Sequence, residues 1–259
     1  MPLQSISSIG FNIFAKDNYI SKMHFDEIRS KVGLLSPSEG LSWISREFGA
    51  KAKFSSALGI EDQIITYLIA SQNLSIEIFT LDTGRLFQET YDLLDLTRSK
   101  YRVHIKTYFP DYRQVEQLLT TKGSNSFYSS VENRKECCFI RKVKPLKRAL
   151  EECTVWITGI RAEQSANRGE MELVSWDDQH KVIKYNPLLN WSEQDVLKFV
   201  EENKIPVNTL HKKGFSSIGC APCTRAVAPE EDSRAGRWWW ETSSKECGLH
   251  ETKAELKLK

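Results

Sequence analysis

Short strand-like runs alternate with helical segments over residues 52–109 of this chain. AKFSSA (52–57), SIEIFTLD (75–82) and RVHIKTYF (102–109) have the character of strands. QIITYLIASQ (63–72) and LFQETYDLLDLTRSKY (86–101), which lie between them, have the length and pattern of helices. Such alternation forms a parallel sheet covered by helices. The predicted fold class is therefore α/β, with a mostly parallel sheet flanked by helices.

Helix caps and further elements extend this pattern on both sides. Ser36 or Ser38 caps a helix that ends at Gly49, and Ser192 with Asp195 forms a capping box that opens another helix. Because a proline closes the run KVIKYNPLL, we expect that run to be an edge strand. The remaining predicted elements are helices over 111–123 and 137–152, a strand over 154–160, the edge strand over 181–189 and a helix over 192–203.

The chain is predicted to form one large domain with two appendages. Residues 1–35 show no clean period and are expected to form an N-terminal arm, and residues 237–259 a polar tail. No internal repeat or low-complexity linker interrupts residues 36–236, so we expect these to form a single domain. The 259 residues, of which 40% are hydrophobic, suffice for a substantial core.

Composition excludes several classes of partner. Thirty-six basic and thirty-four acidic residues give a net charge of +2, so no global field favours a long nucleic acid or an acidic membrane surface. No apolar run approaches the ~20 residues that cross a bilayer, and no secretory signal is visible at the start. We expect a cytoplasmic protein. Its six cysteines then hold a metal or perform chemistry.

The loop SSALGIED (55–62) joins a predicted strand to a helix N-terminus. Its candidate ligand residues are Ser55, Ser56, Gly59 and Asp62. Backbone N–H groups at such a position attract anions, which favours a phosphate-type site. The loop has neither the Walker ending nor the GxGxxG pattern. The alternative interpretation is a tight turn in which Glu61 and Asp62 favour the start of the helix.

A second loop, LDTGRLFQET (81–90), repeats this geometry after the next strand. Carboxyl ends of neighbouring parallel strands meet at one edge of the sheet, so two such loops predict a cleft there. Arg85 on its own could equally be a solvated surface residue. The candidate substrate-binding residues of this turn are Leu81, Asp82, Thr83, Gly84 and Arg85.

Four cysteines form two pairs. Cys137 and Cys138 are adjacent, and Cys220 and Cys223 form the motif CAPC. Four thiolates suit zinc or an iron-sulfur cluster. Adjacent side chains on a helix diverge by about 100°, which favours a 4Fe-4S cluster over one small ion; unrelated core cysteines are the third interpretation. Cys153 has no partner by spacing and is expected to be a small buried residue.

The sixth cysteine, Cys247, lies in the polar stretch SSKECGLH (243–250). Free cysteines are usually buried, so a cysteine flanked by Lys245, Glu246 and His250 is predicted to be exposed and reactive.

In these motifs the chain resembles the assimilatory adenylyl-sulfate (APS) reductases, the iron-sulfur branch of the phosphoadenylyl-sulfate (PAPS) reductase family. The resemblance spans about Ser55 to His250. It implies an adenine-nucleotide alpha-hydrolase-like fold, a 4Fe-4S cluster on the four paired cysteines, and Cys247 as the nucleophile. The motifs that carry it are SSALGIED, LDTGRLFQET, ECCFIRKVKPL, GIRAEQSANR, YNPLLNWSEQDV, GCAPCTRAVAPEEDSRAGRWWWE and ECGLH.

The resemblance also implies which residues bind the substrate. Lys142 would lie between cluster and substrate, and Gly159 and Arg161 of GIRAEQ would take part in binding it. Arg161, Arg234 and Arg237 would meet the phosphate and sulfate oxygens, for which the guanidinium fork is suited. Of Trp238, Trp239 and Trp240, most are expected to anchor the tail by apolar packing, whereas one ring could close over the nucleotide.

The implied reaction is the reduction of adenylyl sulfate to sulfite and AMP in sulfate assimilation and cysteine biosynthesis. Cys247 would attack the sulfonyl sulfur and become an S-sulfocysteine, from which thioredoxin or glutaredoxin releases sulfite. That partner needs access, so we expect residues 237–259 to form a mobile tail. The sequence leaves open whether the chain forms a homo-oligomer.

Three alternatives stay open at this stage. The substrate could be PAPS, or both APS and PAPS, although family members that use PAPS mostly lack the cluster cysteines. A pyrophosphate-loop tRNA thiolase would need an SGGxDS-type loop and a broad basic surface. A non-catalytic nucleotide-binding protein with structural zinc would contain zinc and would lack the brown colour of an iron-sulfur protein.

Overall fold

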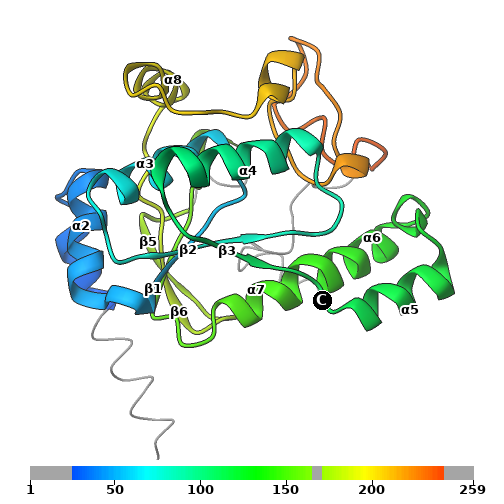
Figure 1. Cartoon of the computed structure of the whole chain (residues 1–259), viewed down its shortest axis with the longest axis horizontal. Helices are drawn as coiled ribbons and strands as arrows, with labels where there is room; N and C mark the ends of the chain where they lie inside the picture. The colour runs from blue at the N-terminus through cyan, green and yellow to red at the C-terminus, as the bar shows by residue number, and fades with distance from the viewer. Residues whose placement is uncertain (1–24, 165–170, 242–259) are drawn as a thin grey trace, which may run out of the picture.

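The computed structural model describes residues 25–164 and 171–241, and its centre is a six-stranded sheet (Figure 1). The strand order is β3-β2-β1-β4-β6-β5. Every neighbouring pair is parallel except β5 and β6, so the predicted mostly parallel sheet is confirmed. The strands are β1 Ala52–Ser55, β2 Glu77–Leu81, β3 Ile105–Tyr108, β4 Val155–Ile157, β5 Val174–Asp177 and β6 Val182–Tyr185.

Local capping signals start several of the surrounding helices. The Ser36 hydroxyl accepts a hydrogen bond from the Glu39 N–H, and Ser192 does the same for Asp195, so both predicted caps are confirmed. The helices are α2 Pro37–Phe48, α3 Ile60–Ser71, α4 Gln88–Tyr101, α5 Tyr112–Lys122, α6 Val131–Cys138, the π-helical turn Phe139–Val143, α7 Lys144–Ala149 and α8 Glu193–Glu202.

The two faces of the sheet bury different side chains. Phe54 of β1 and Ile78 of β2 belong to a large core that includes residues of α2, α3, α4 and α8. Phe79 of β2 and Trp156 of β4 point the other way and pack with Leu146 and other residues of and next to α7. Successive strand residues point to opposite faces, so both faces are covered by helices, as Figure 1 shows for α4 and α7.

Two details of the sheet differ from the sequence-based expectation. The prediction of an edge strand over 181–189 is wrong, because β6 pairs with β4 on one side and β5 on the other. Pro187 lies two positions beyond Tyr185, the last residue of β6, so it removes no ladder hydrogen bond from the strand. The antiparallel strand β5 was not predicted, and it occupies the edge in place of β6.

The expected appendages contain residues that pack into the folded body. Residues 25–32 are helical, and Ile28 and Val32 belong to the large core. At the other end, Arg237, Trp238 and Glu241 are buried. Buried residues therefore lie on both sides of the two predicted domain boundaries, the one between residues 35 and 36 and the one between residues 236 and 237.

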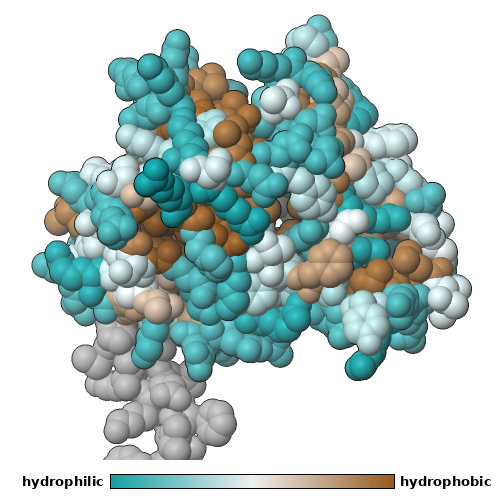
Figure 2. Space-filling model, in the orientation of Figure 1, coloured by the Kyte–Doolittle hydropathy of each residue, from teal (hydrophilic) through white to brown (hydrophobic). Residues whose placement is uncertain are grey.

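Hydrophilic residues cover most of the face seen in Figure 2, and hydrophobic groups reach the surface in separate places between them.

The helices within the described ranges are all too short or too polar to span a bilayer.

Candidate active site

Two cysteine pairs that are distant in sequence line one pocket. Cys137 and Cys138 end α6, and Cys220 and Cys223 lie at the short 3-10 helix Ala221–Cys223. All four side chains line one pocket. Cys220 and Cys223 are each only 9% exposed. The fold thus brings together the four cysteines that the spacing had grouped.

The helix that carries Cys137 and Cys138 begins earlier than predicted. Ser130 caps it by accepting a hydrogen bond from the Asn133 N–H at 3.2 Å, so α6 starts at Val131. After Cys138 the helix widens into a π-helical turn, a rare conformation that occurs frequently at functional sites. Arg134 before the cysteine pair, both cysteines, and Arg141 and Lys142 after it therefore line the same pocket.

Four basic side chains share the wall of this pocket: Arg85, Arg134, Arg141 and Lys142. Arg141 is 6% exposed, and its Nη1 donates to the Thr83 carbonyl at 2.6 Å. Within the described residues its buried Nε has no hydrogen-bond partner. A buried unpaired donor is costly, so this guanidinium is suited to an acceptor or an anion that the pocket takes up.

If the pocket cysteines ionise, the buried thiolates need a nearby positive charge to stabilise them. Burial raises the pKa of Cys137, and it raises the pKa of Cys223 to about 12. The Cys220 thiolate would raise both pKa values further, whereas nearby Lys142 and Arg237 lower that of Cys223. Thiolates in such surroundings are stabilised by a bound metal centre, whose binding displaces the protons.

This arrangement fits a cofactor wider than one ion. In the ranges 25–164 and 171–241, no three His, Cys, Asp or Glu side chains converge closely enough to hold a single metal ion. The four thiols nevertheless share one pocket, and the cations in its wall balance part of the negative charge that four thiolates bring, although Arg134 is paired with Glu241. The residues present therefore fit an iron-sulfur cluster.

The turn after β2 forms part of the same pocket. The Thr83 hydroxyl lies 3.2 Å from the Cys220 sulfur, and the Arg85 carbonyl accepts from the Ala221 N–H at 2.8 Å. The Arg85 guanidinium lies over the Phe127 ring and donates to the Ser124 carbonyl at 2.7 Å. Sequence reasoning assigned this turn to the substrate cleft and missed its contact with the cysteines.

The turn also joins the cysteine pocket to the sheet edge. Gly84 has φ +69, a left-handed conformation that favours glycine, and Asp82 accepts from its N–H at 2.8 Å. Asp82 follows Leu81, the last residue of β2, and also accepts from the Tyr91 hydroxyl at 2.9 Å. The predicted substrate-binding turn therefore has a fixed conformation.

The loop after β1 is held by its own side chains. The Asp62 carboxylate accepts from the N–H groups of Ala57 at 2.7 Å and Gly59 at 3.4 Å, and the Ser56 hydroxyl accepts from Leu58. Two of the N–H groups expected to be free for an anion are thus engaged with Asp62. Gly159 packs so closely on this carboxylate that a Cβ there would collide with it.

Ser55, Asp62 and Gly159 nevertheless lie in one region. Ser55 ends β1 and accepts from the Trp156 indole at 2.8 Å, and Gly159 follows β4, the parallel neighbour of β1. β2 is the neighbour of β1 on its other side, so the loops after three adjacent parallel strands meet at one edge. That edge is where α/β sheets bind nucleotides.

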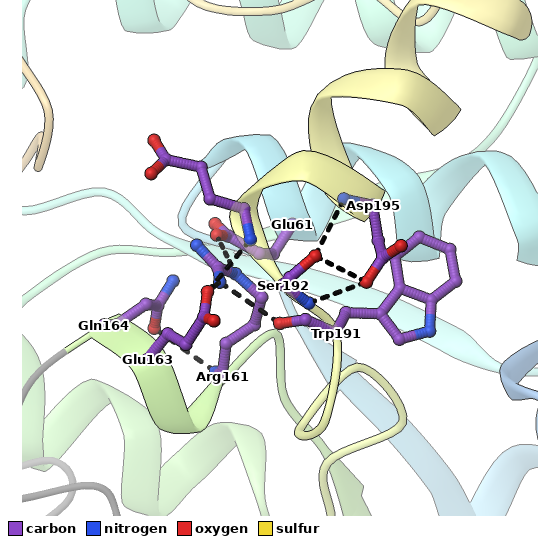
Figure 3. A network of polar contacts seen from close by, with 8 residues as sticks. Glu61, Arg161, Glu163, Gln164, Trp191, Ser192 and Asp195 are labelled. Atoms are coloured by element: carbon purple, nitrogen blue, oxygen red, sulfur yellow. Dashed lines mark hydrogen bonds and ion pairs between the residues drawn. The ribbon is translucent and has the colours of Figure 1, made fainter.

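Arg161 lies in a network of acidic side chains at this edge (Figure 3). Its Nε donates to Glu61 at 2.8 Å, and its Nη1 donates to Glu163 at 3.1 Å and to the Trp191 carbonyl at 3.2 Å. Glu163 also accepts from the N–H of Glu193 at the start of α8. Arg161 therefore connects the starts of α3 and α8, and it is 7% exposed.

Arg237 is buried beside the cysteines, whereas Arg234 is half-buried. The Arg237 guanidinium packs so closely on Gly219 that a side chain there would collide with it. Its Nη1 is 3.4 Å from the Ser217 hydroxyl and the Ile218 carbonyl, and its buried Nε has no partner within the described residues. This cation is therefore available to an anion.

The three consecutive tryptophans, Trp238, Trp239 and Trp240, differ in how far they are buried. Trp238 is 1% exposed and packs with Phe127, Cys220 and Cys223, with Trp240 against the same cluster. Trp239 is 49% exposed. Two of the three rings therefore pack with the hydrophobic cluster that contains Cys220 and Cys223.

The remaining predicted site residues have different outcomes. Lys142 lines the pocket next to Cys138. Cys247 lies outside the described residues. Cys153 is half-buried, its sulfur donates to the Val155 carbonyl at 3.3 Å, and burial raises its pKa to about 12.

Helix spacing could have identified two pocket residues that the sequence analysis missed. Arg134 precedes Cys137 by three positions and Arg141 follows Cys138 by three, and residues three apart lie on one helix face. The pairing of Glu61 with Arg161 carried no comparable local signal, because that partner lies a hundred positions away.

Comparison with known proteins agrees with this geometry. Residues 51–226 match the family model described as phosphoadenosine phosphosulfate reductase domain. A relative from Burkholderia cepacia named adenosine 5'-phosphosulfate reductase is 49% identical over 203 residues, spanning 78% of this chain and 81% of the relative. One of the same name from Neisseria meningitidis serogroup B is 51% identical over 201 residues, spanning 77% and 82%.

Solved structures show the same fold. The phosphoadenylyl-sulfate reductase from Candida auris, in a phosphate complex, has a TM-score of 0.68 and 26% identity, covering 85% of this chain and all of that chain. The FMN adenylyltransferase from Candida glabrata has a TM-score of 0.52 at 14% identity, covering 98% and 85%, and shows the fold alone. The predicted adenine-nucleotide alpha-hydrolase-like fold is confirmed, and the chain belongs to the phosphoadenosine phosphosulfate reductase domain family.

Proposed function

We propose that this chain reduces adenylyl sulfate to sulfite and AMP in assimilatory sulfate reduction and cysteine biosynthesis. The observation that carries the proposal is the single pocket lined by two cysteine pairs and four basic residues, beside the strand-end loops. Relatives that are 49% identical over 203 residues and 51% identical over 201 residues are named for this substrate.

Basic side chains would bind the phosphosulfate group of adenylyl sulfate. This group carries negative oxygens on both phosphorus and sulfur, which bidentate guanidinium groups match. We assign this role to Arg161, Arg234 and Arg237, with Lys142 on the side of the cysteines. Among the described residues the buried Nε of Arg237 has no partner, which supports its role, whereas Arg161 would share its charge between substrate and Glu61.

The strand-end loops would hold the nucleotide part. The proposed contacts come from the loops after β1, β2 and β4, which adjoin one another at the edge of the sheet. The residues in this group are Ser55, Ser56, Gly59, Asp62, Leu81, Asp82, Thr83, Gly84, Arg85 and Gly159.

Cys247 would perform the covalent step. Its thiolate attacks the sulfonyl sulfur, a sulfur–sulfur bond forms, and the bond from sulfur to the phosphate oxygen breaks, so that AMP leaves with the electron pair. A thioredoxin or glutaredoxin thiolate then attacks the Cys247 sulfur and expels sulfite. The second thiol of that dithiol releases Cys247, so the dithiol supplies two electrons and becomes a disulfide.

Cys137, Cys138, Cys220 and Cys223 would hold a 4Fe-4S cluster. When bound, such a cluster supplies charge and redox-active iron next to Lys142 and Arg141, and hydrogen bonds from neighbouring residues adjust its properties. The chain's own residues contribute the thiolates, the basic wall, and the Thr83 hydroxyl beside Cys220.

We favour adenylyl sulfate over its 3'-phosphorylated form because the relatives at 49% and 51% identity are named for adenylyl sulfate. Use of both substrates is the second candidate, since the Candida auris structural neighbour at 26% identity is named for the phosphorylated form. A reducing cytoplasm suits an enzyme whose cysteines bind a cluster and act as a nucleophile.

A single-turnover experiment tests the proposal. Anaerobically purified, cluster-loaded protein receives adenylyl sulfate without any reductant. We expect one AMP released per active site and one sulfonate, about 80 Da, added to the peptide that contains Cys247, because the reaction stops at the covalent intermediate. Added thioredoxin should release sulfite and restore the original mass.

The matched control is Cys247→Ser, which should bind nucleotide and retain iron but form no adduct. An adduct on a different cysteine, or normal turnover by Cys247→Ser, would refute the assignment of the nucleophile. Stoichiometric zinc without iron after anaerobic purification would refute the cluster.

A further inference from the structure

A buried ion pair fixes the end of the described chain to the helix that carries two pocket cysteines. Arg134 of α6 donates from Nε to Glu241 Oε1 at 2.9 Å and from Nη2 to Oε2 at 2.8 Å. The side chains are 3% and 4% exposed. A bidentate guanidinium–carboxylate pair specifies direction as well as distance, so it fixes the Glu241 side chain against α6.

The turn before Glu241 is held in a costly backbone conformation. Trp238 has φ 41, in the left-handed region that bulky residues avoid, and it is 1% exposed. The Arg134 guanidinium lies 4.6 Å from the centroid of its ring and that of Arg237 lies 4.9 Å away. Such a conformation persists only where the surrounding contacts enforce it. We infer that the two guanidinium groups over the Trp238 ring help to hold it.

The same turn is bonded to the cysteine pocket. The Trp238 N–H donates to the Cys223 carbonyl at 3.1 Å, and the Glu241 N–H donates to the Trp238 carbonyl at 2.8 Å. Arg134 lines the pocket and lies one helical turn before Cys137 and Cys138. The ion pair, the turn and the pocket thus form one contiguous unit.

Cys247 follows Glu241 by six positions in the sequence. Six residues span at most about 20 Å when fully extended. The point at which Glu241 is fixed therefore limits the region that Cys247 can reach, and that point adjoins the cysteine pocket.

We propose that Arg134 and Glu241 are positioning residues that anchor the segment carrying Cys247 beside the pocket. This inference rests on the proposed function, in which Cys247 is the nucleophile. Anchoring accelerates the covalent step because a short tether raises the effective concentration of the thiol at the bound substrate.

The expected size of the effect follows from the tether length. With the anchor intact, the tether begins at Glu241, six residues before Cys247; if the turn loosens back to Cys223, it begins twenty-four residues before. Effective concentration falls roughly as the −3/2 power of tether length, so a fourfold longer tether predicts about an eightfold slower covalent step.

The test uses the full-length, cluster-loaded protein with Glu241→Gln, which removes the charge and keeps the shape. We expect the single-turnover rate of sulfonate transfer to Cys247, measured at saturating adenylyl sulfate, to fall about eightfold, whereas iron and sulfide content stay unchanged. Alkylation of Cys247 by iodoacetamide without substrate should keep its rate, because the reactivity of the thiol itself is unaltered.

Two further variants make the result specific. Lys122→Met breaks a 2.6 Å ion pair between Lys122, at the end of α5, and Glu136, which lies on α6 like Arg134. The side chains of this control pair are 42% and 41% exposed. This variant should leave the sulfonation rate unchanged. Glu241→Asp keeps the charge on a shorter side chain and should give a rate between those of the wild type and Glu241→Gln.

Three results would overturn the inference. An unchanged sulfonation rate in Glu241→Gln would show that the pair does not position the nucleophile. A slower rate accompanied by loss of iron would show that it supports the cofactor site instead. Failure of the wild type to form any adduct on Cys247 would refute the proposed function itself, and with it the purpose of the anchor.

Discussion

The buried pair of Arg161 and Glu61 offers a test that separates stability from substrate binding. The two side chains are 8% and 10% exposed, and Nε lies 2.8 Å from Oε1. Arg161→Met keeps much of the side-chain volume but leaves the Glu61 carboxylate buried without its closest cation. Breaking a buried pair in this way costs about 3–5 kcal/mol in the free energy of unfolding.

The double variant Arg161→Met/Glu61→Gln should recover at least about 2 kcal/mol of that loss, because neither buried charge of the pair remains and Glu163, which also loses Arg161, is 58% exposed. Arg46→Met provides the matched control. It breaks a pair of similar length, 3.1 Å, between side chains that are 69% and 42% exposed, and water already solvates both charges. We expect no measurable change in stability for this control.

Urea denaturation followed by tryptophan fluorescence measures these differences in the free energy of unfolding. Thermal unfolding is a second measurement: for a chain of this length each kcal/mol shifts Tm by about 2–4 °C, so Arg161→Met should melt roughly 6–20 °C below the wild type. Activity gives the second arm. If Arg161 also binds the substrate anion, the double variant should regain stability while its kcat/KM stays at least about thirtyfold low.

Either arm can refute the reasoning. A stability loss below about 1 kcal/mol in Arg161→Met would contradict the argument that Glu61 needs Arg161 to balance its buried charge. Recovery of kcat/KM together with stability in the double variant would show that Arg161 only joins α3 to α8 and makes no contact with substrate.

Three further outcomes are expected. Cys220→Ser should lose iron, sulfide and activity together, because a site with three thiolates binds a cluster more weakly; iron and sulfide assays of anaerobic protein measure this. Arg237→Ala should lower kcat/KM about thirtyfold, or about 2 kcal/mol, with poor rescue by lysine, and a change within twofold would remove Arg237 from the site. Cys153, whose pKa burial raises to about 12, should resist iodoacetamide at pH 8, as peptide mass mapping can establish, and Cys153→Ser should retain turnover.

Signals confined to a few neighbouring residues were readable from the sequence. Alternating strand and helix patterns predicted the mostly parallel sheet, because side-chain period and element length are local properties. The caps at Ser36 and Ser192 were predicted because their partners lie three positions away. The grouping of the four cysteines came from chemistry, since two thiol pairs in a reducing compartment suit one metal centre.

The neighbours of a strand in the sheet were not readable in this way. Pro187 suggested an edge strand, but β6 acquires partners on both sides from β4 and from the unpredicted strand β5. A proline removes a hydrogen bond only at its own position, and this one lies beyond the strand. Strand order depends on which segments return to the sheet, which no window of sequence contains.

The sequence by itself determined the fold class, the capped helices and the chemical inventory of the site. The tertiary structure decided what each charged side chain faces. Arg161 and Glu61 are a hundred positions apart, and Arg134 and Glu241 are 107 apart. Such pairs form because burial makes an unpaired charge costly, and burial is a property of the packed chain that no single residue carries.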